Sequence, residues 1–441
     1  MNQHVLSDPR PGLHAAPSRK RNLRNAAYNL ADQLLPAIAF ITATPFLVFR
    51  LGVEQYGIWM LVNALTGAMG FFSVGLGDAT IKYVSGYRGK EDPVAIKRVL
   101  HSTLALSLFL TVVAALLVFI TSDYLAHSVF RIEREDQQLA VHAIQIGGIL
   151  LGLRFVESVF LSCLRGFERY DLSAKISMGI RIGTLVFAVS LVAVGYGVVA
   201  ILLMTCGATL AGIAVQVLAI RRLLPIADFW PSVEPAAIRE VLGFGIYSWL
   251  QGIGGILFTH ADRLLIGALL GPAPLAYYTI CTQLAQQIHA LPAAALNFLF
   301  PMMSSLCETG ERKELRRLFL RFVLINLVFA FSLFLPLVLF GRLIMTLWMG
   351  ADFANQSYVL LLLLSVAYFL LAINIVPHNT LLGVGRIRFV SLMNLGGGFL
   401  SLVAAGLLIP HLGVQGAAMG RMFYGPAIAV NYLKVKKTLR D

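Results

Sequence analysis

Hydrophobic residues in this chain gather in long runs that short polar connections separate. Twelve runs approach or exceed the length of about 20 residues that a helix needs to cross the hydrocarbon core of a bilayer. They lie at residues 27–49, 57–79, 98–120, 139–163, 172–194, 198–220, 241–268, 275–300, 317–340, 356–382, 388–409 and 414–433. The pattern predicts an all-α polytopic membrane protein with about twelve transmembrane helices and short loops.

The composition supports this fold class. Of 441 residues, 58% are hydrophobic and 13% are charged, which is too little charge for the surface of a soluble protein of this size. The net charge of +13 would indicate nucleic-acid binding in a soluble protein, but in a membrane protein basic residues collect in cytoplasmic loops. We therefore expect no nucleic-acid partner. The four cysteines have no metal-ligand spacing, so we expect no metal site, cofactor or disulfide framework.

The basic residues also predict the orientation of the chain. Most of them lie in the connections that follow even-numbered runs and in the two terminal segments. The other side holds Arg50, Arg131, Arg134, Arg263 and Arg342. This asymmetry predicts that both termini are cytoplasmic. Residues 1–24 are polar and basic and have no apolar signal region, which predicts a disordered cytoplasmic tail.

An internal repeat divides the chain into two halves. The turn at Leu51-Gly52 matches that at Leu270-Gly271, Arg169 matches Arg386, and the residues after Gly197 resemble those after Gly413. Six runs in each half give both halves the same orientation in the membrane, so the repeat is parallel. We predict an N-terminal six-helix lobe at 25–222, a cytoplasmic linker at 223–240 and a C-terminal six-helix lobe at 241–436.

No enzyme motif occurs in the sequence, and the only sizeable outer loop, at 123–136, is too short for a catalytic domain. The informative residues are instead the charges within the apolar runs, each of which costs about 2.5–3.5 kcal/mol at the centre of a membrane helix. Arg181 and Arg421 have no acidic residue within one helical turn, which favours a water-filled, cationic lumen. Arg421 could alternatively pair with a carboxylate on another helix.

Other charges allow two interpretations each. Arg154 and Glu157 either neutralise each other on one helix face or line the lumen. Asp262 and Arg263 are adjacent, so they point about 100° apart and face different surroundings. Asp32 shares a helix face with Asn25 and Asn29, which forms either a cavity wall with a proton or cation site or a polar turn near the headgroups.

Three stretches resemble a known family. Phe49-Arg-Leu-Gly-Val-Glu-Gln-Tyr-Gly-Ile-Trp, Val74-Gly-Leu-Gly-Asp-Ala and Ala261-Asp-Arg-Leu-Leu-Ile-Gly are similar to the polysaccharide transporter family. That family contains the O-antigen and exopolysaccharide flippases of the multidrug/oligosaccharidyl-lipid/polysaccharide exporter superfamily. The resemblance covers residues 22–435.

The resemblance implies two six-helix lobes that form a V around a central cavity. It implies that a polyprenyl-diphosphate-linked oligosaccharide moves from the cytoplasmic to the periplasmic leaflet of a bacterial inner membrane. Arg154, Arg181, Arg421 and Arg263 would then bind the diphosphate and any acidic sugars. If transport is coupled to an ion gradient, Asp32, Glu157 or Asp262 would be the titrating group. A polysaccharide polymerase and glycosyltransferases would be functional partners.

Three other functions are weighed against this one. A drug or cation antiporter of the same superfamily needs an acid-rich cavity, whereas the deepest charges with no acidic residue within one helical turn are Arg181 and Arg421. A membrane-embedded glycan polymerase or ligase needs a large periplasmic loop, which is missing. A major-facilitator transporter carries a Gly-x-x-x-Asp-Arg-type loop after its second helix, which the stretch from Ser85 to Asp92 does not match.

Overall fold

The computed structural model describes residues 35, 37–225 and 230–439, and within these residues it contains helices and turns but no β-strand. The predicted tail at 1–24 and the candidate coupling residue Asp32 lie outside the described residues. The prediction of an all-α membrane protein is confirmed.

The N-terminal half begins with the helix Ala37–Leu51 and continues with α2 (Val53–Met69), α3 (Phe71–Gly89), α4 (Pro93–Tyr124), the π-helix η1 (Leu125–Val129), α5 (Gln137–Gly166), α6 (Tyr170–Ala193) and α7 (Val198–Leu223). The C-terminal half holds α8 (Pro235–Leu270), α9 (Pro272–Ala285), α10 (Gln287–Ala295), α11 (Leu299–Glu308), α12 (Arg312–Met349), α13 (Ala351–Ile373), α14 (Ile375–Gly383), α15 (Ile387–Leu412), α16 (Val414–Met422) and α17 (Gly425–Thr438).

Seven of these helices are long and apolar enough to cross a membrane, and the bent pair Pro272–Ala295 and Leu299–Glu308 would make an eighth. Ala37–Leu51 is a shorter apolar helix. These findings establish a multi-pass protein within the described residues, and the count of twelve spans stays a prediction.

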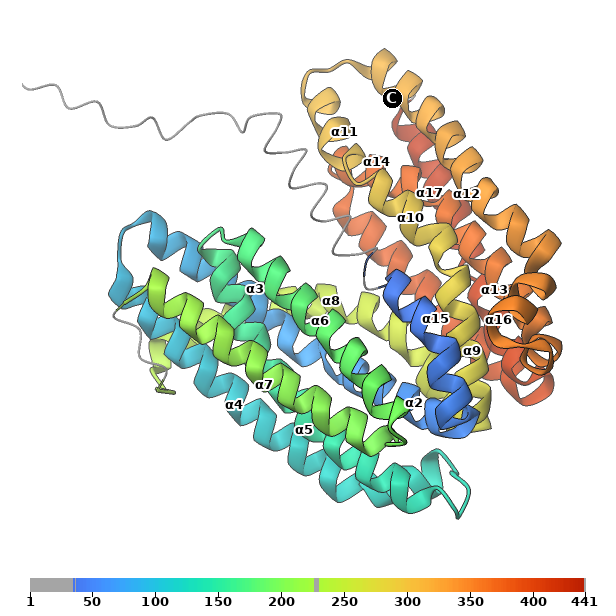
Figure 1. Cartoon of the computed structure of the whole chain (residues 1–441). Helices are drawn as coiled ribbons and strands as arrows, with labels where there is room; N and C mark the ends of the chain where they lie inside the picture. The colour runs from blue at the N-terminus through green and yellow to red at the C-terminus, as the bar shows by residue number, and fades with distance from the viewer. Residues whose placement is uncertain (1–34, 36, 226–229, 440–441) are drawn as a thin grey trace, which may run out of the picture.

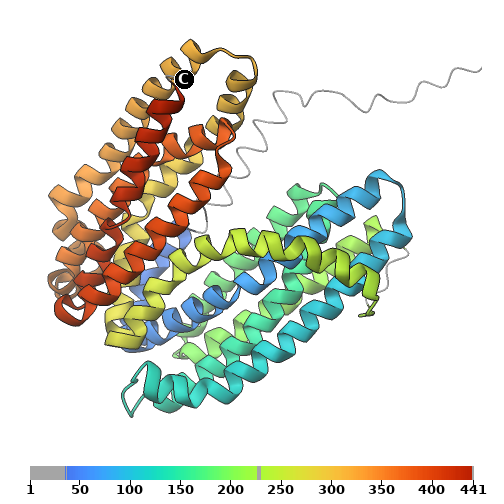
Figure 2. The ribbon, with the colours of Figure 1, turned by 180° about the vertical axis from the view of Figure 1, so that it is seen from behind.

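The two halves form separate bundles that meet at one end and diverge toward the other (Figures 1 and 2). We call the meeting region, where α2 contacts α9, the apex. We call the divergent end, which carries the turns at Glu91, Glu168 and Gly310, the basic end. The prediction of a V-shaped molecule is confirmed.

The backbone confirms the parallel repeat. The described part of the chain has ten residues with positive φ, five in each half. They form five pairs that are 217 to 219 residues apart: Gly52 with Gly271, Glu91 with Gly310, Arg131 with Gly350, Glu168 with Gly385, and Gly195 with Gly413. A residue in the left-handed backbone conformation commonly ends a helix, and glycine adopts this conformation without strain. The halves therefore turn at the same places, although three turns in the N-terminal half use glutamate or arginine.

Helix α8 connects the two bundles. Near its start, the Glu240 carbonyl accepts a hydrogen bond from the Tyr83 hydroxyl (3.0 Å), and the Glu240 carboxylate accepts one from Tyr87 (3.1 Å). A Cβ atom at Gly245 would lie 3.0 Å from the Gly75 carbonyl oxygen of α3. The first turns of α8 thus pack on the N-terminal bundle, whereas its last turns belong to the C-terminal one. The lobe boundaries at 222 and 241 stay predictions.

Close packing and a buried polar chain join the bundles at the apex. Gly57 allows α2 to touch α9, because a Cβ atom there would lie 2.1 Å from the Pro272 carbonyl oxygen. The Thr44 hydroxyl donates to the Gln283 carbonyl oxygen (3.1 Å), and the Gln283 amide nitrogen donates to the Tyr56 hydroxyl (3.1 Å). All three of these polar side chains are buried. The apex is therefore sealed by contacts that cross from one half to the other.

Candidate functional site

A cavity of about 590 Å³ lies between the two bundles. One side is formed by Ala37 of the first helix and Arg181 of α6. The other side is formed by Gln286, Gln287, His289, Ala290, Leu291, Ala293, Ala294 and Asn297, which run from the end of α9 through α10. A volume in this range suits a small-molecule or headgroup site.

Arg181 is the only charged residue among the described residues that line this cavity. Helix α6 buries few side chains, namely Ser173, Ala188 and Val192, so most of its surface faces away from the bundle core. This leaves Arg181 exposed in the middle of the helix. An arginine at such depth needs water or an anionic partner, and the cavity provides room for both.

Two further charges on α5 lie near Arg181. Arg154 is exposed and Glu157 is half-buried, and the charges of both arginines act on the Glu157 carboxylate. Gln216 of α7 is fully buried close to Glu157, and neither of its amide atoms has a hydrogen-bond partner among the described residues. The structure therefore brings Arg154, Glu157 and Arg181 into one cluster that carries a net positive charge.

The described residues of the opposite wall carry no charge but several hydrogen-bonding groups. Gln286 lies where α9 passes into α10, and Asn297 lies in the short break between α10 and α11, where the helix axis bends by 42°. The Gln287 amide nitrogen donates to the Gln283 backbone carbonyl (3.1 Å). Its carbonyl oxygen is left to accept another hydrogen bond. Broken helices of this kind are common beside transporter substrate sites.

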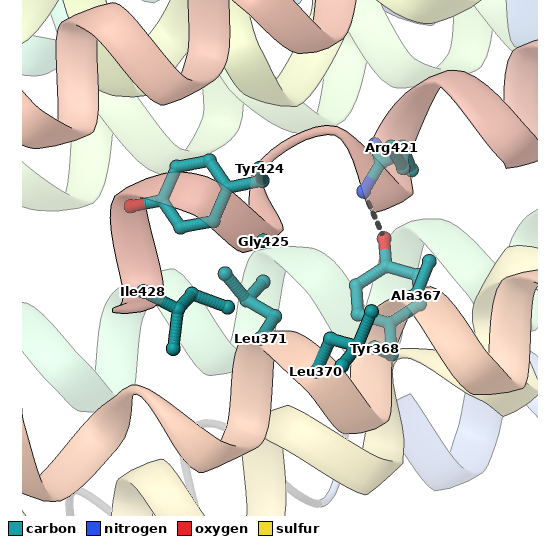
Figure 3. Close-up of a pocket in the computed structure, with 8 residues that line it drawn as sticks. All are labelled: Ala367, Tyr368, Leu370, Leu371, Arg421, Tyr424, Gly425 and Ile428. Atoms are coloured by element: carbon teal, nitrogen blue, oxygen red, sulfur yellow. Dashed lines mark hydrogen bonds between the residues drawn. The ribbon is translucent and has the colours of Figure 1, made fainter. Parts of the chain in front are cut away.

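Arg421 and Asp262 form a separate, buried network in the C-terminal half. Arg421 Nη2 lies 2.6 Å from Asp262 Oδ2, and Arg421 Nε lies 3.0 Å from the same oxygen. Tyr278 donates to Asp262 Oδ2 at 2.5 Å and accepts from Arg421 Nε at 2.7 Å, while Arg421 Nη1 donates to the Tyr368 hydroxyl at 2.8 Å. Figure 3 shows Arg421 above Tyr368 at the edge of a small pocket that also includes Tyr424 and Ile428.

This network decides between the two interpretations of Arg421, because the arginine pairs with a carboxylate on another helix. The Arg421 and Asp262 side chains are only 9% and 4% exposed, so their charges are held against each other and away from solvent. A role of Arg421 in substrate binding stays a prediction, as does a role of Asp262 in ion coupling. Neither residue lines the central cavity.

His260 and Arg263, which flank Asp262, lie near α2. A Cβ atom at Gly67 would lie 2.3 Å from His260 Cε1, so the imidazole packs directly on the α2 backbone. Arg263 is half-buried and close enough to Tyr56 for its charge to act on that hydroxyl. Its Nε atom has no hydrogen-bond partner among the described residues. Arg263 thus lies at the junction of the halves, and a substrate-binding role for it stays a prediction.

The carboxamide wall and the two tyrosines of the buried network were not among the residues predicted from the sequence. The signal for the wall was present, because Gln283, Gln286, Gln287 and Asn297 interrupt the eighth apolar run. Tyr278 and Tyr368 gave no such signal, since tyrosine is common in membrane helices and only the fold brings these two side chains to Arg421.

Comparisons with known proteins agree with this architecture. The sequence profile of the family described as "Polysaccharide biosynthesis protein" matches residues 22–307. A Shigella flexneri protein named "Putative O-antigen transporter" is 23% identical over 410 residues, which cover 90% of this chain and 93% of the relative.

Two solved structures share the fold. One is an inward-facing multidrug resistance transporter of the MATE family in the MOP superfamily, with a TM-score of 0.74, 15% identity and coverage of 94% of this chain and 98% of that one. The other is the lipid II flippase MurJ in an inward closed conformation, with a TM-score of 0.74, 11% identity and coverage of 93% and 87%.

Proposed function

The chain belongs to the polysaccharide biosynthesis protein family, and from this premise we propose that it is a flippase for polyprenyl-diphosphate-linked oligosaccharides. The substrate would be a repeat unit of O-antigen, capsule or exopolysaccharide. The observation that carries the proposal is the cavity between the halves, in which Arg181 faces a wall of carboxamides. A relative named as an O-antigen transporter supports the same substrate class.

The electrostatics of the cavity suit this substrate. A diphosphate that enters a membrane-embedded cavity loses much of its water, and arginine restores charge and hydrogen bonds through its planar guanidinium group. Arg154 and Glu157 lie beside Arg181, and the cluster keeps a net positive charge. The diphosphate would therefore bind at the α5–α6 side of the cavity.

The positions of the basic loops support the direction of transport. The basic end would face the cytoplasm of a bacterial inner membrane, with both termini on that side. The halves diverge toward this end and are sealed at the apex, so a substrate would enter from the cytoplasmic leaflet (Figure 1). Rocking of the two halves would then open the apex toward the periplasmic leaflet. There a polymerase would use the repeat unit that glycosyltransferases had built in the cytoplasm.

Glu157 is better placed than Asp262 to couple transport to an ion gradient. Its carboxylate lies beside the arginine that lines the cavity, so its protonation would change the charge that the substrate meets. Asp262, in contrast, has its Oδ2 atom held by Arg421 and Tyr278 and its Oδ1 atom held by the Arg263 backbone. An exchange of ions at Asp262 would require that whole network to open.

The fold is shared with multidrug transporters, but the cavity argues against a drug or cation antiporter. A cationic drug needs a carboxylate or the face of Trp, Tyr or Phe, and the described residues that line the cavity include none of these. Similar proteins are named as a transporter and a flippase, which also supports a transporter rather than a polymerase or ligase.

The test is the leaflet distribution of the lipid-linked oligosaccharide in cells with and without the protein. An impermeant reagent that modifies only periplasmic glycan reports this distribution. Loss of the protein should leave the oligosaccharide protected on the cytoplasmic side. Arg181→Ala should do the same at normal protein levels, and Arg181→Lys should retain part of the activity if charge alone matters.

Lys175 provides a matched control, because it carries the same charge on the same helix and does not line the cavity. Lys175→Ala should export normally. Unchanged periplasmic exposure in a strain that lacks the protein and any redundant transporter would contradict the proposed function.

A further inference from the structure

The two walls of the central cavity differ in chemistry. The α6 wall carries the cation Arg181, whereas the α9–α11 wall carries Gln286, Gln287 and Asn297 and, among its described residues, no charge. A single anionic ligand would need only the first wall. The second wall therefore suits a part of the ligand that is polar but uncharged.

Carboxamides are suited to hydrogen bonding with hydroxyl groups. Each one offers a carbonyl acceptor and an NH₂ donor, and a sugar hydroxyl both donates and accepts. A neutral amide also meets the ligand without the large desolvation cost of a buried charge. The alanines between the carboxamides, Ala290, Ala293 and Ala294, leave space in front of them.

The repeat shows that the two glutamines of this wall are specific to one half. The turns on either side, at Gly271 and Gly310, both match residues exactly 219 positions earlier, so the stretch between them aligns without gaps. At that spacing Gln286 and Gln287 correspond to Gly67 and Ala68, whereas Asn297 corresponds to Asp78. The two glutamines are therefore not a requirement of the shared fold, and the position of Asn297 is polar in both halves but uncharged only here.

We propose that Gln286, Gln287 and Asn297 form a carbohydrate subsite that binds the hydroxyl groups of the sugars next to the diphosphate. The proposal rests on the proposed function, because it assigns the glycan to one wall of the cavity and the diphosphate at Arg181 to the other. The same flippase would then distinguish a loaded lipid carrier from an empty one.

The experiment measures binding to the purified full-length protein in nanodiscs. The two probes are polyprenyl diphosphate without sugar and the native lipid-linked oligosaccharide extracted from the producing cells. Gln286→Met and Asn297→Leu should weaken binding of the oligosaccharide lipid by about three- to tenfold, as expected for one lost hydrogen bond, and leave polyprenyl diphosphate binding within about twofold. Arg181→Met should weaken binding of both probes.

Gln138→Met is the matched control, because Gln138 is an exposed carboxamide that does not line the cavity. It should bind both probes like the wild type. Gln287→Ala gives the same comparison if one of the other variants cannot be purified.

The outcomes separate the subsite from the function. Equal effects of the carboxamide variants on both probes, or no effect on either, would overturn the carbohydrate subsite while wild-type binding still supported the flippase. If the wild-type protein bound neither probe, the flippase proposal would be overturned and the subsite with it.

Discussion

The two halves of this protein share a backbone and differ in where they place their charges. All five positive-φ turns of one half recur in the other. The N-terminal half exposes Arg154 and Arg181, whereas the C-terminal half holds Arg421 against Asp262 inside its bundle. The comparison shows that the turns are common to both halves, while the placement of the charged groups is not.

The counterparts of the C-terminal network are apolar. At spacings of 219 and 218 residues, Asp262 corresponds to Ala43 and Arg421 to Leu203. The N-terminal half therefore forms the same arrangement of helices without an ion pair at these two positions. This fits the general finding that buried ion pairs add little net stability compared with apolar residues of similar volume.

The largest expected effect is that of breaking this pair. Asp262→Ala should lower the free energy of unfolding by about 3–5 kcal/mol, because it leaves the Arg421 charge buried without its partner. The double variant Asp262→Ala/Arg421→Leu, which installs the residues of the other half, should be more stable than either single variant. Thermal unfolding of the purified proteins in one detergent measures both effects. A double variant as unstable as the sum of the single variants would contradict this explanation.

The apex offers the next comparison. Gly57 corresponds to Ala276 at a spacing of 219, so Gly57→Ala makes the two halves alike at this position. The new Cβ atom would lie 2.1 Å from the Pro272 carbonyl oxygen, and overpacking of this kind costs about 1–3 kcal/mol. Gly86→Ala, whose Cβ atom would have no neighbour within 4 Å, should be neutral or slightly stabilising. Equal melting temperatures for the two variants would argue against close packing at the apex.

Two buried tyrosines allow the stability contribution of a hydrogen bond to a neutral group to be compared with that of a bond to a charged group. The Tyr56 hydroxyl accepts from a neutral amide, whereas the Tyr278 hydroxyl donates to the Asp262 carboxylate. Tyr56→Phe should cost about 0.5–1.5 kcal/mol and Tyr278→Phe about 1.5–3 kcal/mol, since bonds to charged groups are stronger. Unfolding of the two variants under the same conditions gives the difference. The reverse order would show that Tyr278 contributes little to the buried network.

The sequence predicted the fold well because its signals are periodic or local. Runs of apolar residues, the charge of the loops and the turns at Gly52 and Gly271 are all visible without a structure. The sites were less predictable because they depend on contacts between distant residues. Arg421 pairs with a residue 159 positions earlier, and Arg181 lines the same cavity as Gln286, Gln287 and Asn297 only because the two halves lie on either side of it.

The smallest expected effect concerns the first turn of α2 at the apex, where Glu54 corresponds to Ala273 in the other half. Burial, and then the nearby charges of Glu133 and Asp136, raise the pKa of Glu54 above its ordinary value of 4.5. The folded protein therefore binds this proton more tightly than the unfolded chain does, and stability from this group falls as the pH rises from 4.5 through the raised pKa.

Glu54→Ala removes the group whose deprotonation lowers the stability of the folded protein. The melting temperature of this variant should therefore rise relative to that of the wild type as the pH increases from about 4 to 7.5. Glu135→Ala, which removes the same charge from an exposed position in the neighbouring loop, is the control and should show a smaller change with pH. If the difference in melting temperature between Glu54→Ala and the wild type were instead the same at every pH, that result would contradict a raised pKa of Glu54 in the folded protein. The two halves would then be electrostatically equivalent at the positions of Glu54 and Ala273.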